Sequence, residues 1–359
     1  MRWILAALAS IPLGAISPIA LGSEGSLPEI VGVRVGMCGQ YKAGLWTPVE
    51  VLLRGGSEPW SGQVAAITPD GDGMPCRFFS PTDPTCSVQP GDSKSISLFV
   101  KFGRTEPSLT VQLFQSEGAV QVHREFKATA VELPSVFPRA LRSTEGLIVV
   151  VGPETLAIEE TLAGVRQPAG GRVVAVRLSD AAQLPSHWCG FESADMVVLA
   201  TSDAKAYAGL KAGSPPVVAL EQWVRMGGSL LLCAGRNAES LVGAGGPLAG
   251  FAPGKLVRTI PLRNTNAIET YCGGAAQIPR EGFAKQTALR APQWSEVEGV
   301  VEAREGNLPL IVRRSLGFGS VVFVGLDLDL PPLAAWSDRG QLWGKLLGEI
   351  GRASCRERV

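Results

Sequence analysis

The 359-residue sequence has little histidine, little tyrosine and no excess of either charge. It contains two His and three Tyr residues, and its 33 Lys and Arg residues balance 33 Asp and Glu residues. No run of basic residues stands out, so nucleic acid and anionic lipid have no support as electrostatic partners. The sequence has neither a Cys-x-x-Cys pair nor a His-rich cluster, which argues against zinc, and it lacks a P-loop for nucleotide phosphates. We therefore expect no metal and no cofactor.

The first 22 residues are typical of a secretory signal peptide. Arg2 precedes an apolar run over residues 3–21, and small residues stand just before a cleavage site at Ser23. Two prolines interrupt the run, which favours cleavage, and an uncleaved membrane anchor is the alternative. In either case the rest of the chain is expected outside the cytoplasm.

Residues 350–359 do not read as part of a domain. The stretch GRASCRERV at 351–359 resembles a translated sequencing adaptor, and a genuine basic tail is the alternative. We therefore expect the natural protein to continue beyond Glu349, where a membrane segment would anchor it. The roughly 330 residues between the two ends exceed the usual size of one hydrophobic core, which predicts two domains.

Residues 28–132 have the pattern of an antiparallel β-sandwich. Short alternating segments are separated by Gly, Pro, Asp and Ser, and no helical period occurs. Val31, Val33 and Val35 are expected on one face of the first strand. Many short strands separated by turns predict a sandwich of immunoglobulin-like size. The expected strands are 31–35, 49–53, 63–67, 95–101, 108–114 and 119–126.

Six cysteines precede the adaptor-like tail, an even number in a compartment where disulfides persist. Their spacing is not that of a disulfide framework. Cys76 and Cys86 flank a proline-rich loop and are the candidate pair. The alternative is that most of these cysteines are small buried hydrophobic residues.

Residues 133–145 are interpreted as a linker, after which the hydrophobic period changes. The apolar run 146–151 is typical of a parallel strand buried on both faces, and segments 155–165 and 215–226 have helical spacing. Strands alternating with helices predict a doubly wound, flavodoxin-like α/β domain over residues 146–349. The other strand candidates are 172–178, 195–200, 229–233, 255–260, 299–303, 309–313 and 320–326.

The segment 223–241, WVRMGGSLLLCAGRNAESL, places Cys233 at the end of an apolar strand. It resembles the nucleophile elbow of class I glutamine amidotransferase-like domains, where a Cys lies in a Gly-x-Cys-x-Gly turn. The matching positions are Leu231, Cys233 and Gly235, so only the second glycine is retained. The resemblance covers roughly residues 146–348 and implies that Cys233 is the nucleophile if the domain is catalytic.

The histidine that this family places after the nucleophile is absent. Only His123 and His187 occur, and both precede Cys233. A buried thiol without a base stays protonated and is a poor nucleophile, so Cys233 is expected in the core. A pair between Cys233 and His187 would need a geometry foreign to the family.

Two carboxylates, Asp327 and Asp329, follow the last predicted strand in the sequence GLDLDLPP. Ligands of such sheets bind at the carboxyl ends of the strands. Asp327 and Asp329, together with Cys233 and Gly235, are therefore candidates for a ligand-binding edge. The alternative is that both carboxylates cap or solvate the turn before Pro331.

Residues 41–53, YKAGLWTPVEVLL, resemble the lead domain of exported bacterial membrane proteins that combine a sandwich, an amidotransferase-like domain and a membrane helix. The resemblance implies an architecture rather than an activity. We expect a non-catalytic extracytoplasmic envelope protein, membrane-anchored at full length, that binds an unidentified protein or small molecule. Two alternatives stay open. One is an exported amidase or hydrolase using Cys233, and the other is an assembly module with an exposed apolar patch on the sandwich.

Overall fold

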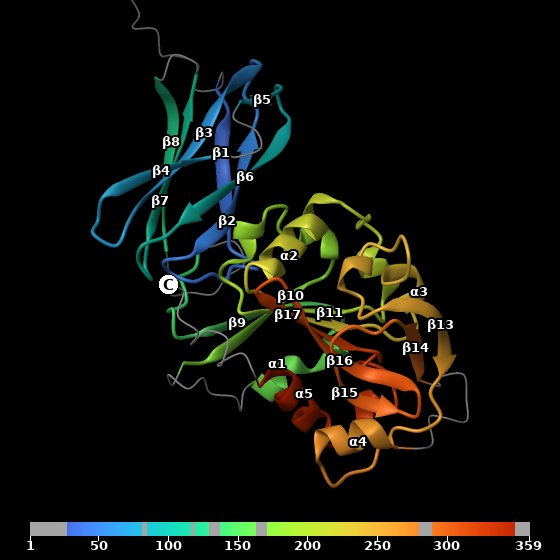
Figure 1. The fold of residues 1–359 in the computed structure, drawn as a ribbon. Helices are drawn as coiled ribbons and strands as arrows, with labels where there is room; N and C mark the ends of the chain where they lie inside the picture. The colour runs from blue at the N-terminus through green and yellow to red at the C-terminus, as the bar shows by residue number, and fades with distance from the viewer. Residues whose placement is uncertain are drawn as a thin grey trace, which may run out of the picture.

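A computed structural model describes residues 27–80, 85–115, 119–128, 137–162, 171–279 and 289–348 (Figure 1). Strands make up 41% of it and helices 19%, in several sheets, which confirms a β-rich multi-domain fold. The predicted signal peptide (1–22), the start of the predicted linker (133–136), the end of the helix predicted over 155–165, and the adaptor-like tail (350–359) lie outside the described residues.

The first unit consists of two antiparallel sheets that share one core. One sheet has the order β1-β2-β6, and the other has the order β4-β3-β7-β8 with β5 added to β3. Residues of both sheets meet in a single cluster, among them Val51 and Leu98 from the first sheet and Val111 from the second. The strands are β1 (Glu29–Val35), β2 (Trp46–Arg54), β3 (Trp60–Pro69), β4 (Pro75–Phe79), β5 (Cys86–Val88), β6 (Ser93–Lys101), β7 (Ser108–Phe114) and β8 (Val120–Lys127).

One prediction about β1 is wrong. The pairing with β2 shifts between Ile30 and Gly32, so Val31 is the extra residue of a β-bulge. A one-residue shift turns side chains to the other face, which leaves Val31 39% exposed while Ile30 and Val35 are buried. The Arg124 side chain on β8 donates hydrogen bonds to the carbonyls of Ile30 and Val31.

The candidate disulfide between Cys76 and Cys86 does not fit this sheet. Cys76 on β4 lies opposite Thr68 of β3, whereas Cys86 on β5 lies opposite Gly62. Positions 62 and 68 of one strand are separated by roughly 20 Å, since each residue advances about 3.3 Å. A disulfide requires Cα atoms within about 7 Å, so these two thiols do not pair.

The second unit is built on a seven-stranded sheet of order β10-β9-β11-β12-β17-β16-β15. Neighbours from β10 to β17 pair in parallel, and β16 and β15 add an antiparallel hairpin at one edge. The strands are β9 (Gly146–Val151), β10 (Val173–Leu178), β11 (Met196–Ala200), β12 (Ser229–Cys233), β15 (Val300–Glu305), β16 (Leu308–Leu316) and β17 (Gly319–Val324).

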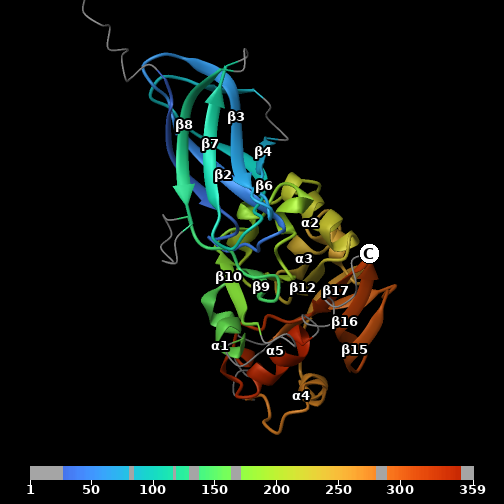
Figure 2. The same ribbon diagram turned by 90° about the vertical axis from the view of Figure 1, so that its left-hand side faces the viewer.

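Helices cover both faces of this sheet, because alternate residues of each parallel strand enter two different cores. Leu230 and Leu232 of β12 pack with α2 (Pro215–Arg225) and with the region around α3 (Ala238–Leu241). Leu231 and Cys233 point to the opposite face, where α1 (Ile158–Leu162) lies beside α5 (Arg339–Leu347) (Figure 2). Because both faces are covered, the buried positions of the strand must all be apolar, as residues 230–233 of β12 are.

The expected strand over 255–260 forms but does not join the main sheet. It is β13 (Lys255–Pro261), which in the described part of the chain pairs with β14 (Arg290–Ser295) alone, in a separate antiparallel ribbon. Most of its side chains are exposed or half-buried, so it lacks the apolar character of a central parallel strand. The short helix α4 (Asn266–Cys272) follows it and packs against β15.

The two units meet through buried polar contacts. The Lys42 ammonium of the first unit donates to the Asp195 carboxylate of the second over 2.6 Å, and Lys42 is only 4% exposed. The Trp46 N–H donates to the Glu192 carboxylate over 2.7 Å, and the Ser193 hydroxyl donates to the Trp46 carbonyl. These contacts connect the start of β2 to the segment just before β11.

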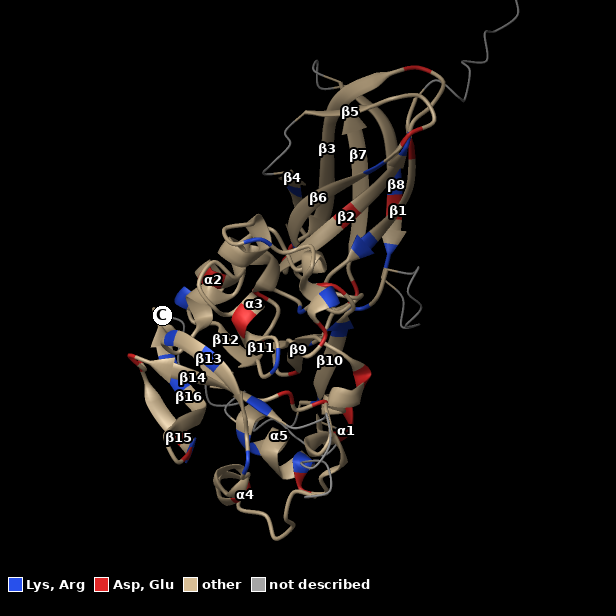
Figure 3. Cartoon of the chain, turned by 90° about the vertical axis from the view of Figure 1, so that its right-hand side faces the viewer, with Lys and Arg blue, Asp and Glu red and all other residues tan. Residues whose placement is uncertain are grey.

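Basic and acidic residues are interspersed along the chain in both units (Figure 3). None of the helices in the described part of the chain combines the length and apolarity needed to span a bilayer.

Candidate functional site

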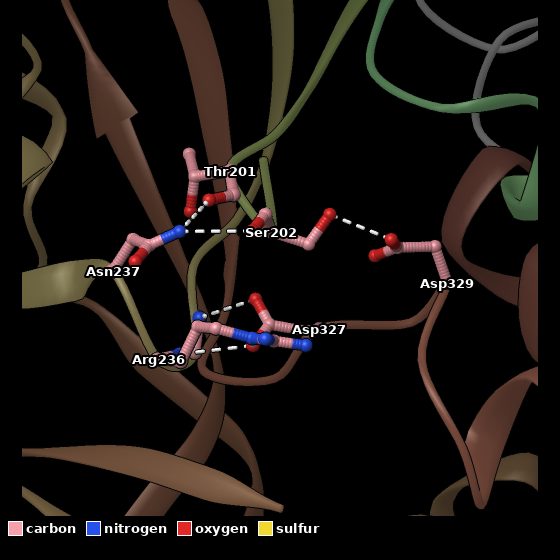
Figure 4. Close-up of polar contacts among 7 residues, drawn as sticks. Thr201, Ser202, Arg236, Asn237, Asp327 and Asp329 are labelled. Atoms are coloured by element: carbon pink, nitrogen blue, oxygen red, sulfur yellow. Dashed lines mark hydrogen bonds and ion pairs between the residues drawn. The ribbon is translucent and has the colours of Figure 1, made fainter. Parts of the chain in front are cut away.

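Three neighbouring parallel strands end at one edge of the main sheet and bring a polar cluster together. Thr201 and Ser202 follow β11, the segment 235–237 follows β12, and Asp327 and Asp329 follow β17 (Figure 4). The ligand-edge candidates Gly235, Asp327 and Asp329 are thus adjacent, as parallel strand order requires.

Cys233 lies at this edge, but its side chain enters the hydrophobic core. It is 1% exposed and packs in the cluster that contains Leu231, Val322 and Val324. Burial raises the pKa of the Cys233 thiol well above its ordinary value, and the nearby carboxylates of Asp329 and Asp327 raise it further. The protonated thiol is therefore the stable form, and it is a poor nucleophile.

The backbone around Cys233 does not offer an oxyanion hole. In a nucleophile elbow, the N–H of the residue after the nucleophile stabilises the oxyanion. Here that residue is Ala234, whose N–H donates to the Val324 carbonyl over 2.9 Å. The next two N–H groups, of Gly235 and Arg236, donate to the Asp327 carboxylate over 3.1 and 2.9 Å. All three donors are engaged within the protein itself.

Asp327 holds the two loops together. Its carboxylate is 4% exposed, accepts the two N–H groups just described, and lies 3.6 Å from the Arg236 guanidinium. Burial raises the pKa of the Asp327 carboxyl above its usual value; the N–H donors of Arg236 and Gly235 act in the opposite direction, and the charge of Asp329 adds to the increase. A Cβ at position 235 would lie 2.6 Å from Asp327 Oδ2, so glycine is required there by the close approach of the loops.

Asp329 has bonding capacity left. It is 4% exposed; its Oδ2 accepts a 2.6 Å hydrogen bond from the Ser202 hydroxyl, and its Oδ1 has no hydrogen-bond partner in the described structure. The fully buried Thr201 hydroxyl is likewise without a partner there. The Asn237 amide fixes this loop, because it donates to the carbonyls of Thr201 and Ser202 (Figure 4).

Neither histidine contributes to the polar cluster. His187 Nδ1 lies 3.0 Å from Cys189 Sγ, and the His187 ring packs against Phe99 of the first unit at 5.4 Å. Burial, followed by the charge of Glu192, raises the pKa of Cys189 to about 11, so this thiol also stays protonated. His123 lies on β8, opposite Gln112 of β7.

Sequence reasoning missed Ser202, Arg236 and Asn237. The available signal was their position, because each follows an apolar run within four residues and such residues gather at the carboxyl edge of a parallel sheet. Among the described residues, no group of three or more His, Cys, Asp or Glu side chains is arranged to hold a metal ion.

Comparison with known proteins gives a partial match. Residues 29–129 match DUF8726, a domain of unknown function. No curated protein sequence matches the chain. The solved structures with similarity include the cytoplasmic protein STM1381 of Salmonella typhimurium LT2, at 12% identity and TM-score 0.38, covering 57% of this chain and 99% of that one. A β-galactosidase of Bacillus circulans sp. alkalophilus has 11% identity and TM-score 0.32, covering 58% of this chain and 31% of its own.

Proposed function

We infer that the protein is a non-catalytic binding protein of the cell envelope whose second unit is an inactive amidotransferase-like domain. The observation that carries this proposal is the environment of Cys233. The thiol at the position of the family nucleophile is 1% exposed, its pKa is raised by burial and by two carboxylates, and no histidine contacts it in the described structure. The same environment argues against the alternative of a Cys-dependent amidase or hydrolase.

The sheet supports the family assignment within this proposal. Numbered along the chain, the five parallel strands β9, β10, β11, β12 and β17 have the order 2-1-3-4-5 across the sheet. This is the order of flavodoxin-like folds, which bind ligands beside the carboxyl ends of their strands. The envelope location rests on the signal-like residues 1–22 and on the resemblance of residues 41–53 to exported proteins.

The proposal is tested by iodoacetamide labelling of the mature protein, with each site quantified by mass spectrometry before and after unfolding in urea. Cys38 is exposed and provides an internal accessible thiol. We expect Cys38 to be alkylated in the folded protein and Cys233 to be alkylated only after unfolding, because a buried, protonated thiol does not react.

The matched control is Cys233→Ala, which should lose only the label that appears on unfolding. Alkylation of Cys233 in the folded protein at a rate equal to that of Cys38, or faster, would contradict the non-catalytic proposal. The hydrolase alternative would then require identification of the group that deprotonates Cys233.

A further inference from the structure

A cleft of about 1010 Å³ lies between the two units, away from the polar cluster of the sheet edge. Its floor is the outer face of the β1-β2-β6 sheet, and its roof is the segment 182–186 of the second unit together with Pro216. Pockets for single small ligands span about 300–1,000 Å³, so this cleft is large enough for an extended ligand.

The floor presents paired charges beside an aromatic ring. Strand register places Arg34, Glu50 and Ser97 in one row across the three strands, and the Arg34 guanidinium lies 2.9 Å from the Glu50 carboxylate. Two residues further along each strand, on the same face of the sheet, the next row holds Pro48 and Phe99. Among the described residues that line the cleft, only Arg34 and Glu50 are charged, and their charges cancel.

The roof and the near wall add uncharged polar groups. Gln183 and Ser186 line the roof and are exposed. Gln40 and Cys38 belong to a tight turn after β1 whose ends, Met37 and Gln40, are bridged by backbone hydrogen bonds. Gln and Ser side chains each donate and accept hydrogen bonds, so these walls suit a ligand with many groups that also donate and accept hydrogen bonds.

The same chemistry argues against other ligand classes. The backbone N–H and C=O groups of β2, the central strand of the floor, are engaged in pairing with β1 and β6, and prolines, which have no N–H, also line the cleft. A peptide adds to a sheet along an edge strand, here β1 or β6, and not on the face that forms the cleft floor. Phosphates and other anions need uncompensated cations, and Arg34 is balanced by Glu50.

We propose that this cleft binds an uncharged oligosaccharide. Sugar hydroxyls donate and accept at once, which matches Gln40, Gln183 and the row from Arg34 to Ser97, while the apolar face of a sugar ring packs on Phe99. The inference is independent of the reactivity of Cys233, because that residue does not line the cleft.

The walls of the cleft are held in fixed positions. The buried ion pair between Lys42 and Asp195 joins the units. At the back of the cleft, a Cβ on Gly190 would lie 2.4 Å from Pro185 and 3.1 Å from the Phe99 ring, so the units are in close contact there. A preorganised cleft loses less free energy on binding than a flexible one.

The experiment measures binding of uncharged maltohexaose, cellohexaose and chitohexaose by calorimetry, with hexagalacturonate as the anionic probe and hexaproline as the peptide probe. Maleimide labelling of Cys38 locates the ligand, since Cys38 lines the cleft, and Cys272 on α4 is the control thiol. We expect one of the uncharged sugars to bind and to slow Cys38 labelling by at least about tenfold, with no change at Cys272.

Two variants test the residues involved. Phe99→Ala and Gln183→Ala should each weaken sugar binding by about tenfold. Gln183 is exposed, so that variant keeps its fold even if Phe99→Ala does not. Val300→Ala, at a 67% exposed position on β15, is the matched control and should leave affinity unchanged. Binding of none of the uncharged sugars at millimolar concentration, stronger binding of either control probe, or binding without protection of Cys38 would overturn the proposal.

Discussion

The junction between the units contains a buried ion pair, and its removal gives a quantitative prediction. Lys42→Met keeps most of the aliphatic stem but removes the ammonium that contacts Asp195 over 2.6 Å. The Lys42 side chain is 5% exposed and the Asp195 side chain 16%, so the variant leaves a mostly buried carboxylate without its cation.

Breaking a buried pair by removing one partner costs about 3–5 kcal/mol. The lower end of that range applies here, because Asp195 Oδ2 still accepts a 2.7 Å hydrogen bond from the Leu147 N–H and part of the carboxylate reaches solvent. We therefore expect Lys42→Met to lower the free energy of unfolding by about 3 kcal/mol.

The assay is urea unfolding followed by tryptophan fluorescence, with linear extrapolation to water. Arg34→Met is the matched control, since it removes the cation of an ion pair whose side chains are 67% and 38% exposed, and it should cost less than about 1 kcal/mol. A double-mutant cycle with Asp195→Asn should show a coupling of at least about 1 kcal/mol. The reasoning fails if Lys42→Met costs no more than Arg34→Met.

Two further predictions concern the sheet edge. Gly235→Ala should lower the free energy of unfolding, measured by urea unfolding, by about 1–3 kcal/mol, because the new Cβ would meet Asp327. Gly344→Ala in α5 is the control and should be neutral or stabilising, because nothing lies within 4 Å of its new Cβ. Equal effects of the two substitutions would contradict the role of Gly235. The raised pKa of Asp327 means that the folded state binds its proton more tightly than the unfolded state. The stability of the wild type relative to Asp327→Asn should therefore fall as pH rises from below the ordinary aspartate pKa through the raised pKa of the folded state, and a flat or rising difference would contradict this.

The strands whose limits were best predicted are those with the strongest physical constraint. β7 (Ser108–Phe114), β9 (Gly146–Val151) and β12 (Ser229–Cys233) begin and end where the sequence pattern places them. β9 is buried on both faces, so every residue must be apolar, and its limits are visible in the sequence. β7 alternates regularly, which is equally visible.

Two strands that sequence reasoning missed, β4 and β5, have no such constraint. β4, with the sequence PCRFF, is exposed or half-buried along its whole length and contains an arginine. β5 has three residues. Both form because β3 is long enough to pair with each of them along different parts of its edge, which is a property of the partner strand and not of their own sequences. The bulge at Val31 is also a result of pairing that the alternation of valines conceals.

At the sheet edge, the sequence pattern predicted which residues come together but not which contacts they make. Gly235, Asp327 and Asp329 each follow a parallel strand, and this position was enough to predict that they lie together. It did not show that Asp327 would accept the N–H groups of Gly235 and Arg236, since that depends on the approach of two loops distant in sequence. The interdomain cleft was beyond sequence reasoning altogether, because its floor and roof come from different units.

The glycine that matches the second glycine of the elbow motif has an explanation that does not involve catalysis. Gly235 is required because Asp327 lies against it, and Asp327 in turn uses the N–H groups that an active elbow would leave available. Cys233 meanwhile stays in the ladder of β12 opposite Val324, with its side chain in the core. The Asp327 carboxylate thus accepts hydrogen bonds from donors that an active elbow would offer to a bound substrate. Under the proposed function, a ligand would therefore bind at another surface, and the cleft between the two units is open to solvent.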